Sequence, residues 1–228
     1  MLDPSGQTAF ESYLEQGCQR AGIPLEENLK QALLVHAREL FFWNKKVNLT
    51  AITDVRGVAD KHFLDALCAA AFIPKDIKLM DLGSGGGFPG LPLKALGPDL
   101  DLTLVDAARK KINFLKQVIR LSGFEKARAL HTRVEDLHSD PAFAGQFDGV
   151  VARGFANLEK LVDLALPLLK EGGVIYSLKG EGGKGEIIPS LEDIFEIDVA
   201  SYALPLGGDK RTMIRLKKIG RASCRERV

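Results

Sequence analysis

A glycine-rich turn at residues 81–90, with the sequence Asp-Leu-Gly-Ser-Gly-Gly-Gly-Phe-Pro-Gly, is the segment best suited to bind a small ligand. It follows a short apolar run and precedes a helix-forming stretch. Glycine permits a sharp turn and a close approach of backbone to ligand, so Gly83 and Gly85 are candidate cofactor contacts. The glycines alone do not identify the ligand, because Gly85, Gly87 and Gly90 also satisfy the dinucleotide pattern G-x-G-x-x-G.

The charge beside this turn separates two classes of cofactor. Asp81 stands two residues before the first glycine, at the end of the apolar run. A carboxylate there would repel a pyrophosphate. S-adenosyl-L-methionine carries a sulfonium and an ammonium group instead, and an acidic residue can accept hydrogen bonds from such a ligand directly or through water. We therefore predict S-adenosyl-L-methionine as the cofactor, with Asp81 among its contacts.

Two more acidic segments follow the next two apolar runs. Asp106 ends the second run, where a carboxylate can accept two hydrogen bonds from a ribose diol. Arg133-Val134-Glu135-Asp136 follows the third run and suits contacts with an adenine ring and its exocyclic amine. Each residue alone could be a solvated strand end. Their order along the chain favours a nucleoside cofactor.

The segment Val151-Ala-Arg-Gly-Phe-Ala-Asn157 is predicted to border the methyl group that is transferred. It lacks the Asp/Asn-Pro-Pro-aromatic turn that commonly orients an exocyclic amine, and no cysteine nucleophile lies near it. An acceptor that is already nucleophilic, such as guanine N7, needs positioning more than a general base. Arg153 and Lys179 are the candidates for positioning phosphate or guanine O6. Arg153 could equally hold the cofactor.

The elements that must place these residues fall into two parts. Residues 1–75 have apolar positions at three- and four-residue spacing, which predicts a helical extension with a second helix opening at Pro24 and a third from Val58 to Phe72. From residue 76 to 219, short apolar runs alternate with helical segments, which indicates an α/β fold with a mostly parallel sheet. We expect strands at 78–82, 102–106, 128–131, 149–152, 174–179, 195–203 and 212–218, and helices at 91–96, 110–122 and 158–169.

The last two expected strands have no helix between them, so an antiparallel hairpin should close the sheet. This is the seven-stranded, Rossmann-like arrangement of class I methyltransferases. Residues 220–228 show no apolar periodicity, and we expect them to be an added tail.

Composition limits the classes of partner. The chain has 228 residues, 27% of them charged, and a formal net charge of +1, so any RNA binding must use a local basic patch. Because no apolar run approaches the roughly 18 residues of a membrane span and the start lacks a signal core, we expect a cytoplasmic protein without a membrane partner. The odd, scattered cysteines predict neither a disulfide framework nor a metal site; they are Cys18, Cys68 and Cys224.

Six segments together resemble the glucose-inhibited division protein B family, bacterial methyltransferases of small-subunit ribosomal RNA. The resemblance runs in order from about Gly22 to Ile219, and Phe-Pro-Gly after the glycines is its most specific part. The segments are Trp43-Asn-Lys-Lys-Val-Asn-Leu-Thr50, Lys61-His-Phe-Leu-Asp-Ala66, Asp81 to Leu91, Arg133-Val-Glu135, Val151-Ala-Arg-Gly-Phe-Ala156 and Leu178-Lys-Gly180.

The resemblance implies N7 methylation of one guanine in the decoding-region loop of 16S ribosomal RNA. The substrate would be the RNA or the small ribosomal subunit, with no DNA partner, and we expect a monomer. The family's cofactor contacts would fall on Gly83, Phe88, Val134, Glu135 and Arg153. No catalytic base is implied.

Two residues of the family pattern have no evident chemical role. Trp43 is interpreted as core packing, and His62 as a hydrogen-bonded structural histidine, with contact to RNA or cofactor as its alternative. Three other functions stay open at this stage. They are a small-molecule methyltransferase, a dinucleotide-dependent oxidoreductase and a ribosome-binding factor without catalysis.

Overall fold

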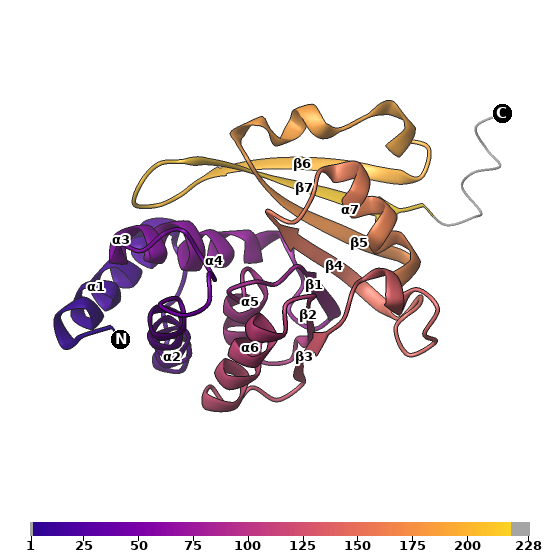
Figure 1. The fold of residues 1–228 in the computed structure, drawn as a ribbon. Helices are drawn as coiled ribbons and strands as arrows, with labels where there is room; N and C mark the ends of the chain where they lie inside the picture. Colours follow the sequence, from indigo (N-terminus) through magenta and orange to yellow (C-terminus); the bar gives the residue numbers. More distant parts are fainter. Residues whose placement is uncertain (1, 220–228) are drawn as a thin grey trace.

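The computed structural model describes residues 2–219, and a seven-stranded sheet forms its centre (Figure 1). The strand order is β3-β2-β1-β4-β5-β7-β6, with β1 to β5 parallel and β7 antiparallel to both of its neighbours. This confirms the predicted class of fold and the closing hairpin. The strands are β1 Lys78–Leu82, β2 Asp101–Asp106, β3 Ala127–His131, β4 Phe147–Arg153, β5 Leu169–Gly180, β6 Phe195–Ala203 and β7 Lys210–Lys218.

Side chains alternate between the two faces of the sheet and build a core on each. On β1, for example, Leu79 belongs to one buried cluster and Met80 to the other. The first cluster packs against α5 (Gly90–Leu96), α6 (Arg109–Leu121) and the N-terminal helices, and the second packs against α7 (Leu158–Ala165). Because β1 to β5 run parallel, they all end at one edge of the sheet, where the loops that follow them meet.

The N-terminal helices cover the first face beside α5 and α6 (Figure 1). They are α1 (Pro4–Ala21), α2 (Glu27–Trp43) and an unbroken helical run made of α3 (Val55–Val58), η1 (Ala59–Leu64), α4 (Asp65–Ala69) and η2 (Ala70–Phe72). The η1 segment is a π-helix. The apolar cluster continues from these helices into the sheet, and the division at residue 75 into extension and main domain stays a prediction.

Two helix starts predicted from the sequence were wrong. The second helix begins at Glu27, not at Pro24, because the Ile23 N–H closes α1 by donating to Cys18 O over 2.9 Å and the chain then needs an extended stretch before it can turn back. The third helix begins at Val55, three residues before the predicted start at Val58. The Asp54 carboxylate accepts from Gly57 N–H over 2.7 Å and caps it.

The ends of two other elements differ from the predicted positions for local reasons. The helix expected to reach Leu169 stops at Ala165, because Pro167 lacks an N–H and the chain passes through the 3₁₀ turn η4 (Leu166–Leu168) into β5. β5 begins five residues before the expected position, across the polar stretch 170–173 and an irregular register with β4. Short 3₁₀ turns complete the chain at η3 (Glu135–Leu137), η5 (Glu181–Glu186) and η6 (Pro189–Leu191).

None of the helices between residues 2 and 219 combines the length and the apolar character that a membrane span requires. The expected tail at 220–228, with Cys224, lies outside the described residues. Cys18 and Cys68 are free thiols.

Candidate active site

The glycine turn after β1 is held by hydrogen bonds to the neighbouring strand. Gly83 N–H donates to Val105 O over 2.9 Å, while the Ser84 hydroxyl donates to Asp81 O over 2.8 Å and accepts from Val105 N–H over 3.0 Å. Gly83 and Gly85 have φ angles of 67° and 54°, in the left-handed region that favours glycine. The turn is therefore rigid and needs glycine at both positions.

Asp81 lies beneath this turn and is fully buried. Its Oδ2 accepts from Gly90 N–H over 2.9 Å, while its Oδ1 has no hydrogen-bond partner among the described residues. Burial raises the pKa of Asp81 to about 7, although the Gly90 N–H and the charge of Arg153 act in the opposite direction. The carboxylate is not part of the lining of the cavity at the carboxyl ends of β1, β2 and β3, so its predicted contact with the cofactor stays a prediction.

A cavity of about 480 Å³ lies at the carboxyl ends of β1, β2 and β3, and we call it the glycine-turn cavity. Asp106 forms part of its wall and is only 8% exposed. Its Oδ1 accepts from Ala108 N–H over 2.8 Å and its Oδ2 from Gly85 N–H over 3.1 Å, with Lys111 Nζ 3.7 Å from Oδ2. Since each carboxylate oxygen has two acceptor sites, the group can still accept hydrogen bonds from a ligand diol.

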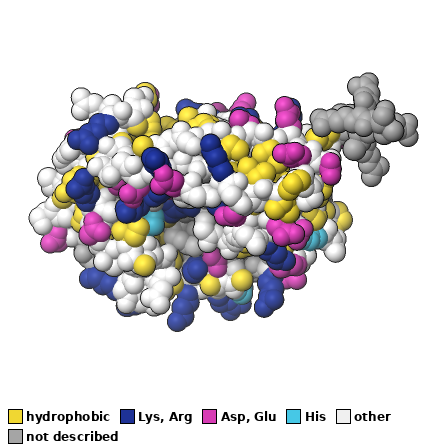
Figure 2. All heavy atoms as spheres, turned by 90° about the horizontal axis from the view of Figure 1, so that it is seen from above, with side chains coloured by type: hydrophobic (Ala, Val, Ile, Leu, Met, Phe, Trp, Pro, Cys, Tyr) yellow, Lys and Arg dark blue, Asp and Glu magenta, His cyan; other side chains and the backbone are white. Residues whose placement is uncertain are grey.

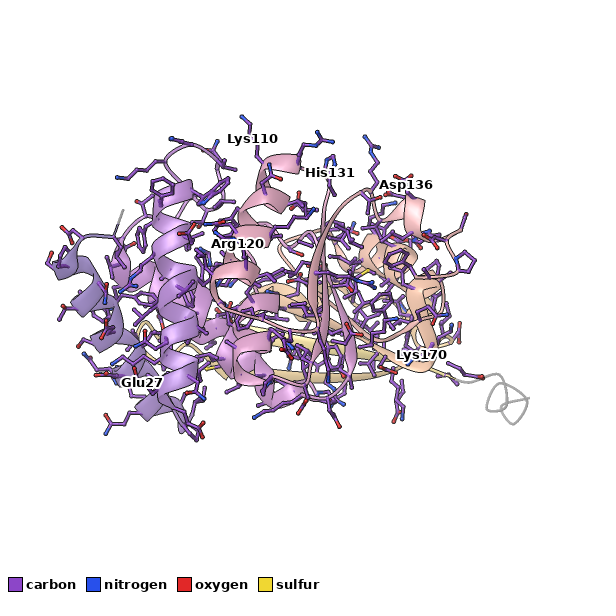
Figure 3. All side chains as sticks on the ribbon, turned by 90° about the horizontal axis from the view of Figure 1, so that it is seen from below. Glu27, Lys110, Arg120, His131, Asp136 and Lys170 are labelled. Atoms are coloured by element: carbon purple, nitrogen blue, oxygen red, sulfur yellow. The ribbon has the colours of Figure 1, made fainter. Side chains whose placement is uncertain are left out.

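Val134 and Glu135 line the other side of the glycine-turn cavity, Val134 as a buried residue and Glu135 as an exposed one. They come from the segment after β3, at the edge where Figure 3 labels His131 and Asp136. Glu27 and Lys170 lie on the opposite side in that view. An apolar side chain beside a carboxylate can offer packing and a hydrogen-bond acceptor to a ring with an amine, and the contact of these two residues with an adenine stays a prediction.

A second cavity, of about 560 Å³, lies beside the first, and we call it the basic cleft. The two share Gly154, so a ligand in one lies next to a ligand in the other. Four cationic side chains and the single carboxylate of Asp65 line the cleft. The cations are Lys61, Arg153, Lys179 and Arg211.

The predicted positioning residues Arg153 and Lys179 both line the basic cleft, at the ends of β4 and β5. The Lys179 ammonium donates to Glu186 Oε2 over 2.7 Å and to Ala156 O over 2.8 Å. The Arg153 guanidinium donates to Asp65 Oδ2 over 3.1 Å, and its carbon lies 5.2 Å from the centre of the Phe88 ring. Both cations are thus fixed at the cleft by the protein itself.

Comparisons with known proteins identify the family of this chain. A family model described as rRNA small subunit methyltransferase G matches residues 29–213. The chain belongs to this family. Relatives named ribosomal RNA small subunit methyltransferase G include one from Geobacter metallireducens, 41% identical over 90% of this chain and 94% of the relative. Another, from Streptococcus sanguinis, is 39% identical over 86% of this chain and 87% of its own.

Solved structures of more distant proteins share the fold of this rRNA methyltransferase. A predicted O-methyltransferase from Agrobacterium tumefaciens superposes with a TM-score of 0.59 at 19% identity, covering 69% of this chain and 82% of its own. TYW2 from M. jannaschii in complex with AdoMet superposes with a TM-score of 0.52 at 15% identity, covering 67% and 73%. These likenesses establish the Rossmann-like methyltransferase fold.

Phe88, one of the cofactor contacts that the family resemblance implied, is buried in this rRNA methyltransferase. Its ring stacks between His36 at 4.6 Å and His62 at 4.8 Å, measured between ring centres. The ring does not line the glycine-turn cavity, and its contact with the cofactor stays a prediction. Gly85 likewise acts here by donating its N–H to Asp106, whereas Gly83 lines the cavity directly.

The sequence analysis missed His36, which holds the glycine turn from the side of α2. Its Nε2 lies 2.7 Å from Gly86 O, so Nε2 carries the proton and donates it. Burial lowers the pKa of His36 to about 4, so the ring is neutral at physiological pH. A polar residue within the apolar stripe Leu33, Leu34, Ala37 and Leu40 was the signal that could have revealed it.

Within residues 2–219, no group of three His, Cys, Asp or Glu side chains could hold a metal ion. Burial raises the pKa of Cys18 and of Cys68 to about 11, so neither is a thiolate near neutral pH. Trp43, predicted to pack in the core, is half-buried against the first apolar cluster and donates its Nε1–H to Glu39 over 3.0 Å.

Proposed function

We propose that this chain transfers the methyl group of S-adenosyl-L-methionine to N7 of a guanine in 16S ribosomal RNA, by in-line displacement and without a general base. The observation that carries the proposal is the pair of adjoining cavities, one with nucleoside-type acceptors and the other lined by four cations, which meet at Gly154. Family membership supplies the class of substrate.

The glycine-turn cavity fits S-adenosyl-L-methionine, which supplies an activated methyl group when bound. Asp106 would accept from the ribose hydroxyls, and Val134 and Glu135 would contact the adenine. Asp81 keeps a buried oxygen without a partner, which favours a cationic ligand over a pyrophosphate. The alternative with a dinucleotide cofactor is weaker for this reason.

The basic cleft fits an acceptor within a nucleic acid. Its four cations can hold the phosphates beside the target base, whereas a small-molecule methyltransferase would be expected to close an apolar pocket around its acceptor. The nucleotide would enter the cleft unstacked, as single-stranded loops of RNA do when proteins recognise them.

The titratable groups in the cleft argue against a general base. The Asp65 carboxylate accepts from Tyr202 O–H over 2.7 Å and from Arg153, so its oxygens are engaged. Burial and the adjacent charge of Arg153 lower the pKa of His62 to about 3, and both of its ring nitrogens have partners. A guanine N7 lone pair needs no deprotonation, so alignment of nucleophile and methyl carbon supplies the catalysis.

The direct test is transfer of labelled methyl from S-adenosyl-L-methionine to 16S RNA or to small subunits that lack the modification. The site is then mapped by cleavage at 7-methylguanine. We expect label at one guanine N7. Label elsewhere in the RNA would refute the N7 assignment, and label on no RNA would refute the whole proposal.

Three variants test which cavity binds the cofactor and which binds the RNA. Asp106→Ala should weaken cofactor binding by roughly tenfold or more, because one charged acceptor is lost, whereas Lys179→Ala should leave cofactor affinity intact and raise the KM for RNA. Lys170→Ala is the matched control, since it removes an ion-paired lysine from the other end of the same strand, 2.7 Å from Asp148. If Asp106→Ala instead raised only the KM for RNA and Lys179→Ala weakened only cofactor binding, the two cavities would be misassigned.

A further inference from the structure

The π-helical turn η1 and the first residue of α4 bring two side chains onto Arg153. His62 Nδ1 lies 2.9 Å from Arg153 Nη2, and Asp65 Oδ2 lies 3.1 Å from Arg153 Nη1. The same Nη1 donates to Lys61 O over 2.8 Å. A π-turn adds a residue to the helix and is frequent at functional sites. Here the Lys61 carbonyl and the His62 side chain of this turn, together with Asp65 directly after it, converge on a single guanidinium.

The contact between Arg153 and His62 fixes the tautomer of the histidine. A guanidinium carries only donors, so His62 Nδ1 must accept and the ring proton must reside on Nε2. Nε2 lies 2.7 Å from Thr50 Oγ1 and donates to it. Thr50 Oγ1 also accepts from Ile52 N–H over 3.0 Å, so this hydroxyl is anchored in turn. His62 is therefore held at both ends, as a neutral acceptor toward Arg153.

The hydrogen bonds of Arg153 leave two of its N–H groups available. Arg153 has five N–H groups, of which Lys61 O, Asp65 and His62 accept three. Among the residues that the structure describes, none accepts a hydrogen bond from the other two N–H groups. The side chain lines the basic cleft beside Gly154, where the two cavities meet. Two oriented donors at this point suit the oxygen atoms of an RNA acceptor, a phosphate or guanine O6.

We propose that His62 and Asp65 are positioning residues for methyl transfer, which hold Arg153 so that its two remaining N–H groups meet the RNA acceptor. This proposal rests on the function proposed above. Asp65 is buried and also accepts from Tyr202 O–H, while the His62 ring stacks on Phe88. Neither residue contacts the reacting atoms. Their effect on the reaction passes through Arg153.

Two substitutions of His62 separate positioning from mere packing. In His62→Asn the amide oxygen takes the place of Nδ1 and can still accept from Arg153, but the link to Thr50 is lost. In His62→Gln the amide nitrogen takes the place of Nε2 and can still donate to Thr50, but Arg153 loses its acceptor. Both variants lose the ring on Phe88, so each is the matched control for the other.

We expect kcat/KM for RNA to be at least about tenfold lower in His62→Gln than in His62→Asn, because a hydrogen bond to a charged group is lost only in the former. Affinity for S-adenosylhomocysteine and Tm should be similar in the two. A structural role for His62 alone would lower kcat/KM to the same extent in both variants, and that result would overturn the proposal.

The tautomer supplies a readout that does not depend on activity. In the unmodified chain, the two ¹⁵N ring shifts of His62 should show a proton on Nε2 and none on Nδ1 near neutral pH, and Arg153→Met should remove this preference. A proton on Nδ1 would overturn the proposal even if methylation proceeds. Conversely, failure of the chain to methylate guanine N7 would refute the proposed function and leave this spectroscopic result standing.

Discussion

Replacing Asp81 by Asn should stabilise the ligand-free protein at alkaline pH while weakening its cofactor site. The side chain is fully buried, and only one of its oxygens has a partner, the Gly90 N–H at 2.9 Å. A charge in that setting is costly, which is why burial raises the pKa of Asp81 to about 7. Asn keeps the shape and the acceptor for Gly90 and removes the charge.

The sign follows from proton linkage. An acid whose pKa rises on folding binds more protons in the folded state, so the free energy of unfolding falls as pH increases between the unfolded and folded pKa values. For Asp81 this window runs from 3.8 to about 7. At roughly 1.4 kcal/mol for each pKa unit, the charged carboxylate lowers the free energy of unfolding by about 4 kcal/mol above pH 7 and by only about 1 to 2 kcal/mol near pH 5.

Comparing the stability gain of the Asn variant at two pH values isolates the effect of the buried charge. Any cost of burying the new amide is the same at both, so the Asn variant should gain about 3 kcal/mol more, relative to the unmodified protein, near pH 8 than near pH 5. Urea unfolding of both proteins at the two pH values measures it. A difference in stability that does not change with pH would refute the buried-charge reasoning. Titration with S-adenosylhomocysteine at pH 8 should show weaker binding by the variant.

Two further predictions concern the glycine turn. Gly83→Ala should lower cofactor affinity, because φ is 67° and a Cβ would collide with the Phe155 ring; ligand titration measures this, and unchanged affinity would contradict the geometry. His36→Leu should weaken cofactor binding more than His36→Gln, whose amide can still donate to Gly86 O; equal binding by the two would show that the hydrogen bond at 2.7 Å does not hold the turn.

Much of the fold could be predicted because the signals are local. Short apolar runs alternating with amphipathic segments define a parallel sheet, and a missing helix between the last two strands defines the hairpin. The predicted strand 195–203 agrees with β6 at both ends. Helix starts were less accurate. They depend on a capping side chain such as Asp54 and on how the preceding helix ends, which composition does not reveal.

The lining of the glycine-turn cavity was more predictable than that of the basic cleft. Gly83, Val134 and Glu135 follow parallel strands and Asp106 ends one, and the carboxyl ends of such strands necessarily meet at one edge. The sequence did not show that Asp81 lies beneath the turn. That position follows from the alternation along β1, which directs residue 81 toward α5, where Gly90 N–H meets its carboxylate.

The arrangement of side chains in the basic cleft depends on contacts between residues far apart in the chain. Arg153 is separated from His62 and Asp65 by about ninety positions, and nothing in the sequence around Lys61-His-Phe-Leu-Asp65 indicates a π-turn. With ideal α-helical spacing, residues 62 and 65 would still share a face. Asp60, on the same short segment, accepts from the N–H groups of residues 206 and 207 in the β6–β7 loop. One short helical turn thus contacts both the closing hairpin and the arginine of the basic cleft, so the helical layer and the sheet meet at this cleft.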